Sequence, residues 1–290
     1  MITSEKIKNL RTITGAGMLD CKKALEEMDG DVEKSIDWLR KKGVNTAQKK
    51  SLRDASEGLI TISISGNYAS ITEINSETDF VSRNDDFKTF CSKISLIALE
   101  NKVSSMEKLL ETKFDESTNV KDELTSMISK IGENIVLKRV NVRSSLNGSF
   151  QKYLHNSVDD NSGKIGVILE FKCDKKFAEL DNISKNICMH IAAMDPKSIT
   201  HEALDEKIKN REMEIFREQL KNSNKPEDIK KKIIEGKMNK FFEEVCLLDQ
   251  YFVIDNKQKV KAFLSDCENK FNCKLEILSF ILFRVGEDNF

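Results

Sequence analysis

The spacing of apolar residues changes near residue 57, and this change constrains the fold more than any other feature of the chain. Residues 4–43 carry apolar side chains at helical spacing, whereas isoleucines at 60, 62 and 64 alternate with threonine and serine. Gly66-Asn67 then offers a two-residue turn before a second apolar run, Tyr68–Ile74. The pattern predicts helices followed by a β-hairpin with one apolar face, in an α+β protein.

The helical segment predicts three short helices. Gly15-Ala16-Gly17 separates the first two, Gly30 precedes the third with Asp31 as its N-cap, and Gly43 is placed to end it. Residues 1–44 are therefore expected to form a three-helix domain that resembles the ubiquitin-associated (UBA) fold. Residues 45–57 are polar and basic, and we interpret them as a linker.

Two related α+β core subdomains with antiparallel sheets are expected after the linker, at 58–142 and at 143–199 with 249–290. Beyond the hairpin, the predicted elements are a helix with a stripe from Phe87 to Ile97, a helical stretch Ser104–Ile131, strands Ile135–Val142, Ile165–Phe171 and Leu275–Val285, and helices Ile183–Ala193 and Val260–Phe271.

Residues 200–248 interrupt the second subdomain with two charge-dense runs of helical period. The runs meet at Asn222-Ser223-Asn224-Lys225-Pro226, and Pro226 is tolerated in the first turn of the second helix. We predict an inserted antiparallel helical hairpin of the coiled-coil type. Its role stays open between a homodimer contact, a second contact with a partner protein, and a spacer.

The composition disfavours nucleic acid and membrane as partners. The chain has 290 residues with 47 basic and 48 acidic side chains, so it has no basic field to neutralise phosphates. No apolar run approaches the roughly 20 residues that span a bilayer, and the start lacks the apolar stretch of an export signal. Seven scattered cysteines without a Cys-x-x-Cys pair indicate reduced thiols. We expect a cytoplasmic protein.

The usual catalytic constellations are missing from the sequence. It has no phosphate-binding Gly-x-x-x-x-Gly-Lys loop, no dinucleotide fingerprint and no Gly-x-Ser-x-Gly elbow, and its three histidines lack metal spacing. We therefore expect no cofactor, no metal and no catalytic residue. The remaining enzyme hypothesis uses the acids Glu73, Glu77 and Asp79, and it predicts a concave pocket around them.

A phenylalanine stands in a polar segment, Glu73–Asn84, between the second hairpin strand and the next helix. An aromatic residue there either folds back onto the core or projects outward to anchor a partner. Most aromatic residues are buried, so Phe80 alone favours the core. Its position at an element boundary favours function, because loops carry binding residues on a rigid scaffold.

Two motifs together resemble the bacterial elongation factor Ts family, whose members exchange the nucleotide of the translational GTPase EF-Tu. They are the segment Leu10–Leu25 and the Phe80 segment just described. Further matches follow in the same order: Lys130-Ile131-Gly132-Glu133-Asn134, Gly163-Lys164-Ile165-Gly166-Val167, His190-Ile191-Ala192-Ala193, Lys225-Pro226, Ile234-Glu235-Gly236-Lys237-Met238 and Arg284-Val285-Gly286-Glu287. The resemblance spans nearly the whole chain.

The resemblance implies that the loop Thr78-Asp79-Phe80-Val81 presses on the GTPase domain of EF-Tu and disturbs its Mg²⁺ and phosphate site. Both GDP-bound and nucleotide-free EF-Tu would be partners. Further contacts implied by the family are Met18, Leu19, Lys22, Ile131, Gly132 and His155. A binding adaptor that uses the UBA-like helices is the main alternative, and such an adaptor would not need the Phe80 loop. Family members commonly continue beyond Val285-Gly286-Glu287 with Gly-Ile, whereas this chain reads Asp288-Asn289-Phe290, so contacts made by that extension are not expected here.

Overall fold

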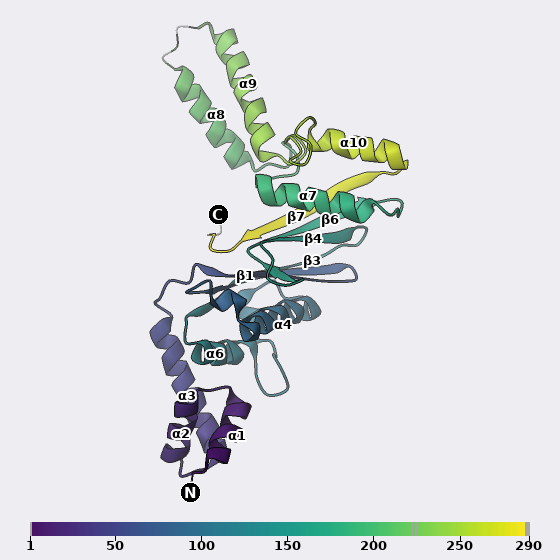
Figure 1. The fold of residues 1–290 in the computed structure, drawn as a ribbon. Helices are drawn as coiled ribbons and strands as arrows, with labels where there is room; N and C mark the ends of the chain where they lie inside the picture. The colour runs from purple at the N-terminus through teal and green to yellow at the C-terminus, as the bar shows by residue number, and fades with distance from the viewer. Residues whose placement is uncertain (1, 222, 224, 288–290) are drawn as a thin grey trace. The chain divides into compact units, whose positions relative to one another are not determined.

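The computed structural model describes residues 2–221, 223 and 225–287. The chain forms two compact units. The first comprises Met1–Ser144, Asn156–Ile165 and Phe283–Phe290, and the second comprises Ser145–His155 and Gly166–Leu282. Both units combine helices with an antiparallel sheet, as the α+β prediction requires (Figure 1).

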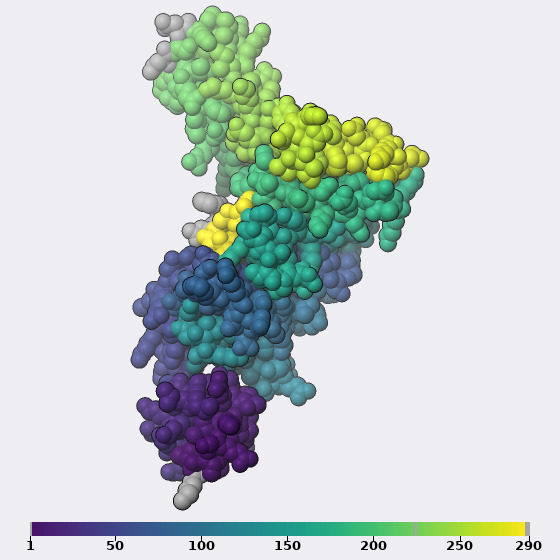
Figure 2. Space-filling model, in the orientation of Figure 1, coloured from purple at the N-terminus to yellow at the C-terminus, as the bar shows by residue number. Residues whose placement is uncertain are grey.

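The chain begins with three helices that share a small core of their own: α1 (Ser4–Thr14), α2 (Met18–Glu27) and α3 (Val32–Lys50). Their central side chains, Leu10, Cys21, Ala24 and Leu25, are fully buried. Asp31 accepts a hydrogen bond from the Lys34 N–H at 3.1 Å, which confirms the predicted N-cap of the third helix. In the space-filling view these helices form the purple body (Figure 2).

The predicted end of the third helix at Gly43 is wrong, because α3 continues to Lys50. Gly43 is buried, and a Cβ atom built there would lie 3.7 Å from the Cβ of Ser129 on α6 (Val120–Ile131). Gly43 thus lies in the contact between α3 and α6, and this packing outweighs the helix-ending tendency of glycine. Lys49 and Lys50 in the last turn interact favourably with the helix dipole.

The first unit contains a four-stranded sheet with the order β3-β2-β1-β5. Strands β1 (Glu57–Ser65) and β2 (Tyr68–Ser76) pair antiparallel, and Ser65 lies opposite Tyr68. This register confirms the two-residue turn at Gly66-Asn67. Strand β3 (Ile135–Ser144) extends the sheet beside β2, and the short β5 (Ser162–Gly163) closes the other edge beside β1.

Both faces of the hairpin are buried, although the face opposite the predicted isoleucine stripe carries mainly hydroxyl side chains. Helix α4 (Asp85–Asn101) packs on the face that carries Leu59 and Ser70, whose hydroxyl donates a hydrogen bond to the Ser95 carbonyl at 2.8 Å. Ile60 and Ile62, on the opposite face, are fully buried as well. Small hydroxyl side chains let the helix approach closely, and their hydrogen bonds offset the loss of water.

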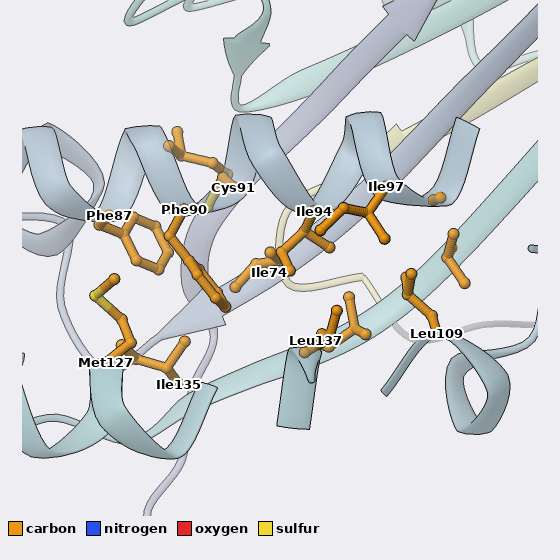
Figure 3. Packing of buried hydrophobic residues seen from close by; sticks show 14 of the residues in the cluster. Ile74, Phe87, Phe90, Cys91, Ile94, Ile97, Leu109, Met127, Ile135 and Leu137 are labelled. Atoms are coloured by element: carbon orange, nitrogen blue, oxygen red, sulfur yellow. The ribbon is translucent and has the colours of Figure 1, made fainter. Parts of the chain in front are cut away.

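The main core of the first unit lies between α4 and the sheet (Figure 3). Apolar side chains of α4 point from one face of the helix toward strands and toward α6. The labelled members of this cluster are Ile74, Phe87, Phe90, Cys91, Ile94, Ile97, Leu109, Met127, Ile135 and Leu137. Their spacing on α4 matches the predicted helical stripe.

The helical stretch predicted over Ser104–Ile131 is interrupted. It consists of α5 (Met106–Glu111) and α6, with irregular chain at 112–119. In this connection the Asp115 carboxylate accepts hydrogen bonds from the backbone N–H groups of Ser117 and Thr118, at 2.8 and 2.7 Å. These bonds lower the pKa of Asp115 to about 2. Local side-chain bonding of this kind competes with the helix.

The second unit contains a three-stranded sheet with the order β4-β6-β7. The strands are β4 (Ser149–His155), β6 (Ile165–Cys173) and β7 (Leu275–Arg284). Helix α7 (Leu180–Met194) follows β6 in the sequence, and helix α10 (Val260–Phe271) precedes β7. The sequence predicted these elements except β4. The side chains of β4 are half-buried or exposed, so the strand lacks the apolar alternation that would have revealed it.

Helices α8 (Glu206–Leu220) and α9 (Glu227–Val245) lie side by side as the predicted hairpin (Figure 1). Two residues of the predicted turn, Asn222 and Asn224, lie outside the described residues. None of the described helices is both long enough and apolar enough to cross a membrane.

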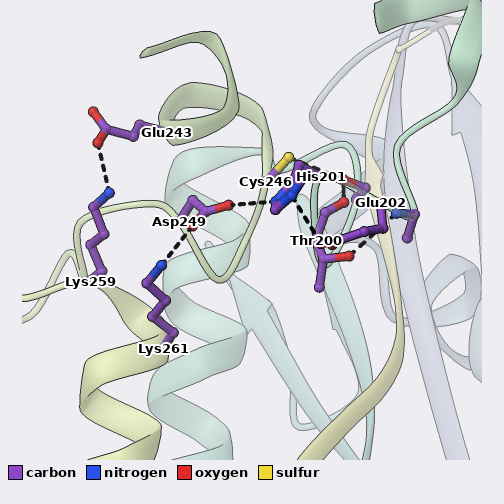
Figure 4. A network of polar contacts seen from close by, with 10 residues as sticks. Thr200, His201, Glu202, Glu243, Cys246, Asp249, Lys259 and Lys261 are labelled. Atoms are coloured by element: carbon purple, nitrogen blue, oxygen red, sulfur yellow. Dashed lines mark hydrogen bonds and ion pairs between the residues drawn. The ribbon is translucent and has the colours of Figure 1, made fainter. Parts of the chain in front are cut away.

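A polar network ties the base of the hairpin to the start of α10 (Figure 4). Lys259 Nζ lies 2.7 Å from Glu243 on α9, and this bond raises the pKa of Lys259. The Asp249 carboxylate lies 3.2 Å from Lys261 Nζ, with which it forms an ion pair, and 3.7 Å from His201 Nδ1. These contacts link the base of the hairpin to neighbouring segments of the second unit.

Candidate partner-binding site

Phe80 projects outward from the loop that joins β2 to α4. It is 75% exposed, whereas its neighbour Val81 is 5% exposed and belongs to the main core. Val81 therefore takes the buried position that the sequence pattern had favoured for Phe80. An exposed ring retains about 1.5–3 kcal/mol that burial against another surface would release.

Short hydrogen bonds give the chain around Phe80 a defined shape. The Ser82 hydroxyl donates to the Asp79 carbonyl at 2.6 Å, and the Arg83 N–H donates to the Phe80 carbonyl at 3.1 Å within the 3-10 helix Val81–Arg83. Asn84 then caps α4 by accepting the Phe87 N–H at 3.1 Å. The ring thus stands on a turn that is fixed immediately before a helix.

A carboxylate from a distant segment holds the start of this loop. Glu133 accepts two hydrogen bonds from Thr78, one from the backbone N–H at 3.0 Å and one from the hydroxyl at 2.7 Å. Glu133 follows Gly132, the left-handed residue that ends α6 with φ of 84°. The end of α6 therefore aims Glu133 at the Phe80 loop.

A second contact runs in the opposite direction between the same two segments. Glu77, in the loop, accepts the Asn134 N–H at 2.7 Å, and the Asn134 amide donates to the Arg53 carbonyl at 2.7 Å. The bond from Asn134, assisted by the Arg53 charge, lowers the pKa of Glu77, so its carboxylate stays ionised. We call Glu77, Thr78, Glu133 and Asn134 together the loop latch.

The three acids of the enzyme hypothesis are committed to different partners. Glu73 is fully buried, where it pairs with Arg139 and accepts the Gly286 N–H at 2.9 Å. Glu77 belongs to the loop latch, and Asp79 faces Arg83 at 3.8 Å. Carboxylates that share acid and base roles must converge on one substrate. These three acids instead stabilise the fold through separate hydrogen bonds and ion pairs.

The other residues expected to contact a partner lie on the first unit, except His155. Leu19 is 81% exposed and Met18 is half-exposed at the start of α2, and Lys22 pairs with Glu26 on the surface. The chain just before them lies beside α6, because a Cβ on Gly15 would be 3.4 Å from the Lys130 side chain. The fold thus brings the loop before α2 to the end of α6.

The end of α6 also reaches the start of α4. Lys130 Nζ lies 2.8 Å from the Asp86 carboxylate in the first turn of α4, and Lys50 Nζ donates to the Gly132 carbonyl. Ile131 is half-buried against the main core, and Gly132 is exposed. The segment that carries the predicted contacts Ile131 and Gly132 therefore also supplies the support of the Phe80 loop.

His155 and His190 differ in exposure and in their partners. His155 is exposed at the end of β4 in the second unit, with Nδ1 3.0 Å from the Tyr153 hydroxyl. His190 is fully buried; its Nε2 lies 2.9 Å from Gln250 Oε1, and its Nδ1 accepts the Val253 N–H at 3.1 Å. Burial lowers the pKa of His190, so the ring is neutral and structural.

The sequence matches known proteins over nearly its full length. The family model described as elongation factor TS matches residues 77–287. The elongation factor Ts of Allorhizobium ampelinum is 42% identical over 286 residues, which cover 99% of this chain and 93% of the relative. That of Clostridium botulinum is 38% identical over 289 residues, which cover 99% and 94%. The chain belongs to the elongation factor Ts family, whose members are exchange factors and not enzymes.

The sequence does not predict the loop latch. In the sequence, Glu133 and Asn134 stand out only as part of a motif that matches the family, and Glu77 only as one acid of the enzyme hypothesis. A glutamate directly after a helix-ending glycine is a weak signal, because its partner is 55 residues away in the sequence. Only the fold identifies these residues as supports of the Phe80 loop.

Proposed function

We propose that this protein promotes GDP release from EF-Tu by inserting Phe80 beside the nucleotide site of the GTPase. The observation that carries the proposal is the exposure of Phe80, 75%, on a loop that the loop latch holds in one shape. A ring that is exposed and already positioned needs little further ordering when it binds, so more of its burial free energy remains for distorting the partner.

The distortion expected in EF-Tu concerns its Mg²⁺ and phosphate ligands. Mg²⁺ requires near-ideal octahedral coordination, and a phosphate loop requires its N–H donors to be aimed at the phosphate oxygens. A small displacement by the loop Thr78–Val81 would weaken both sets of contacts. The chain itself needs no cofactor for this role, and its work would take place in the cytoplasm where EF-Tu operates.

Thermodynamic linkage then describes the exchange. If the factor binds nucleotide-free EF-Tu more tightly than the GDP form, GDP must weaken binding of the factor by the same ratio. A coupling of about 4 kcal/mol would correspond to a roughly thousandfold change in either affinity. GTP then takes the emptied site and displaces the factor by the same linkage.

We further propose the division of labour along the chain that the sequence predicted. Residues 1–44 would be a UBA-like domain that presents Met18, Leu19 and Lys22 to EF-Tu, with 45–57, which begins as the last turns of α3, as the connection to the core. Residues 58–142 and 143–199 with 249–290 would be two related core subdomains, the first presenting Ile131 and Gly132 and the second His155. The exposed side chain of Leu19 and the surface position of Lys22 support this assignment.

The hairpin at 200–248 is proposed as a coiled coil. Lys237 on α9 donates to Gln219 on α8 and also lies over the Phe216 ring at 5.2 Å, so the two helices contact each other through polar as well as apolar groups. Its roles as a homodimer contact, a second contact with EF-Tu or a spacer are separable by deleting it and measuring the molecular mass and the exchange activity.

The test is stopped-flow release of fluorescent GDP from EF-Tu with wild-type protein and with Phe80→Ala. We expect strong acceleration by the wild type and loss of most of it in the variant at saturating factor. Leu146→Ala is the matched control, because Leu146 is also an exposed apolar residue, at 92%, on the second unit. Unchanged release with saturating Phe80→Ala would refute the role of the ring.

A second measurement separates the Mg²⁺ effect from simple binding. If Phe80 acts by disturbing Mg²⁺, the deficit of Phe80→Ala should shrink when Mg²⁺ is chelated, because the ion no longer holds the nucleotide. A deficit of the same size without Mg²⁺ would assign the ring to the phosphate contacts instead. No acceleration by the wild-type protein at any Mg²⁺ concentration would favour the adaptor hypothesis.

A further inference from the structure

Two cysteines that are distant in the sequence meet at one end of the second unit. Cys173 is the last residue of β6, and Cys273 stands between α10 and β7. The two sulfur atoms and a carboxylate oxygen of Asp174 all lie within 4.8 Å of one another. Cys273 is buried, Cys173 is half-buried and Asp174 is exposed, so the group opens to solvent on one side.

Backbone contacts hold the two segments together at this point. The Asp174 N–H donates to the Lys274 carbonyl at 3.3 Å, and the Lys274 N–H donates to the Asp174 carboxylate at 2.8 Å. The second bond fixes the orientation of the carboxylate and leaves other lone pairs for a further contact. These hydrogen bonds therefore hold the segments that carry the three side chains in place.

Two more contacts brace the same junction from outside. The rings of Phe177 and Phe271 stack with centroids 4.3 Å apart at an angle of 12°, and Lys175 Nζ donates to the Asn272 carbonyl. Both contacts join the segment after β6 to the turn before β7. Metal sites require ligands held by surrounding structure, and this junction supplies such support.

We propose that Cys173, Asp174 and Cys273 bind a thiophilic divalent cation of the zinc type. Thiolates select zinc-like ions over Mg²⁺ and Ca²⁺, and three protein ligands with an open fourth position form a recognised zinc geometry. With Zn–S bonds of about 2.3 Å, two sulfurs of a tetrahedral site lie about 3.8 Å apart. The observed grouping needs only small side-chain movements to reach that spacing.

Binding replaces each S–H bond by a sulfur–metal bond, and the two protons pass to solvent. The bound ion would join the end of β6 to the start of β7 and stabilise the second unit. This role is independent of Phe80 and of the exchange reaction. The site was not predicted from the sequence, where the seven cysteines show no paired spacing.

The experiment is a titration of the reduced, full-length protein with Co²⁺, a spectroscopic probe of zinc sites, under anaerobic conditions. We expect one equivalent of Co²⁺ to give a sulfur-to-cobalt charge-transfer band and the intense visible bands of tetrahedral Co²⁺. Zn²⁺ should displace the Co²⁺ and should raise the thermal unfolding midpoint. Absence of the charge-transfer band in the wild-type protein would overturn the proposal.

Variants assign the ligands. Cys173→Ser and Cys273→Ser should each abolish tetrahedral Co²⁺ binding, whereas Cys267→Ser, a cysteine of α10 in the same unit, should retain it. The exposed Asp174→Asn is expected to fold normally and to weaken Co²⁺ binding by at least about tenfold, since even partners of metal ligands have effects of that size. Unchanged Co²⁺ affinity in Asp174→Asn, or a Cys173–Cys273 disulfide that forms in preference to metal binding, would refute this ligand set.

Discussion

Replacing Glu133 by alanine tests whether the Phe80 loop acts because it is held in position beforehand. Glu133 receives both donors of Thr78, at 3.0 and 2.7 Å. Hydrogen bonds to a charged acceptor contribute about 1.5–3 kcal/mol each when they are protected from water. Glu133 is only half-buried, and solvent screening reduces such interactions, so we assign about 1.5 kcal/mol to the pair. This free energy corresponds to about a tenfold change in an equilibrium.

The expected effect of Glu133→Ala is on the concentration dependence of exchange. The variant retains Phe80, but a smaller fraction of molecules holds the loop in the binding shape, and the apparent affinity falls by that fraction. In stopped-flow GDP release at increasing factor concentration, the half-saturating concentration should rise a few-fold, with about tenfold as the upper limit, because the wild-type loop is already mostly in the binding shape. The maximal release rate should stay near that of the wild type, in contrast to Phe80→Ala.

Two further variants make the measurement specific. Thr78→Val removes the hydroxyl bond to Glu133 and keeps the backbone bond, so it should shift half-saturation less than Glu133→Ala does. Glu116→Ala removes an exposed acid of the same unit and should change nothing. If folded Glu133→Ala exchanged GDP with wild-type half-saturation, the reasoning about the loop latch would be wrong. A loss of maximal rate would instead place Glu133 at the nucleotide site.

Three predictions concern stability. Glu73→Ala should lower the free energy of unfolding in urea by about 3–5 kcal/mol, because it removes the fully buried carboxylate that pairs with the largely buried Arg139 guanidinium; a loss below about 1 kcal/mol would contradict this. Because burial lowers the folded-state pKa of His190, the unfolded state binds its proton first, and the urea midpoint should fall as pH drops below about 6.5; His190→Gln should flatten this slope. Gly58→Ala should destabilise strongly, since its Cβ would lie 2.2 Å from the Ile74 carbonyl oxygen. Gly66→Ala meets nothing within 4 Å and is strained only by its φ of +57°, so it should cost less; equal melting temperatures for the two variants would refute the argument.

The fold could be predicted where a short segment carries its own signal. The register of β1 and β2 follows from the Gly66-Asn67 turn, and α10 has the bounds that its apolar period indicated, Val260–Phe271. The prediction of secondary structure failed where contacts with segments distant in the sequence determine the structure. The buried Gly43 continues α3 because α6 packs against it, and β4 is a strand because β6 lies beside it.

The candidate site likewise has features that the sequence determines and features that only the tertiary structure determines. The sequence by itself determined that an aromatic residue stands in a polar loop between a strand and a helix, because strand, turn and helix signals are local. It did not determine which of Phe80 and Val81 is buried, since that depends on the core beneath the loop. Glu133 lies 55 residues from Thr78, and Lys274 lies 100 residues from Asp174, so only tertiary packing assembled the loop latch and the cysteine pair. Such contacts form at a large cost in chain entropy, and the packing of the whole fold supplies the free energy that offsets it.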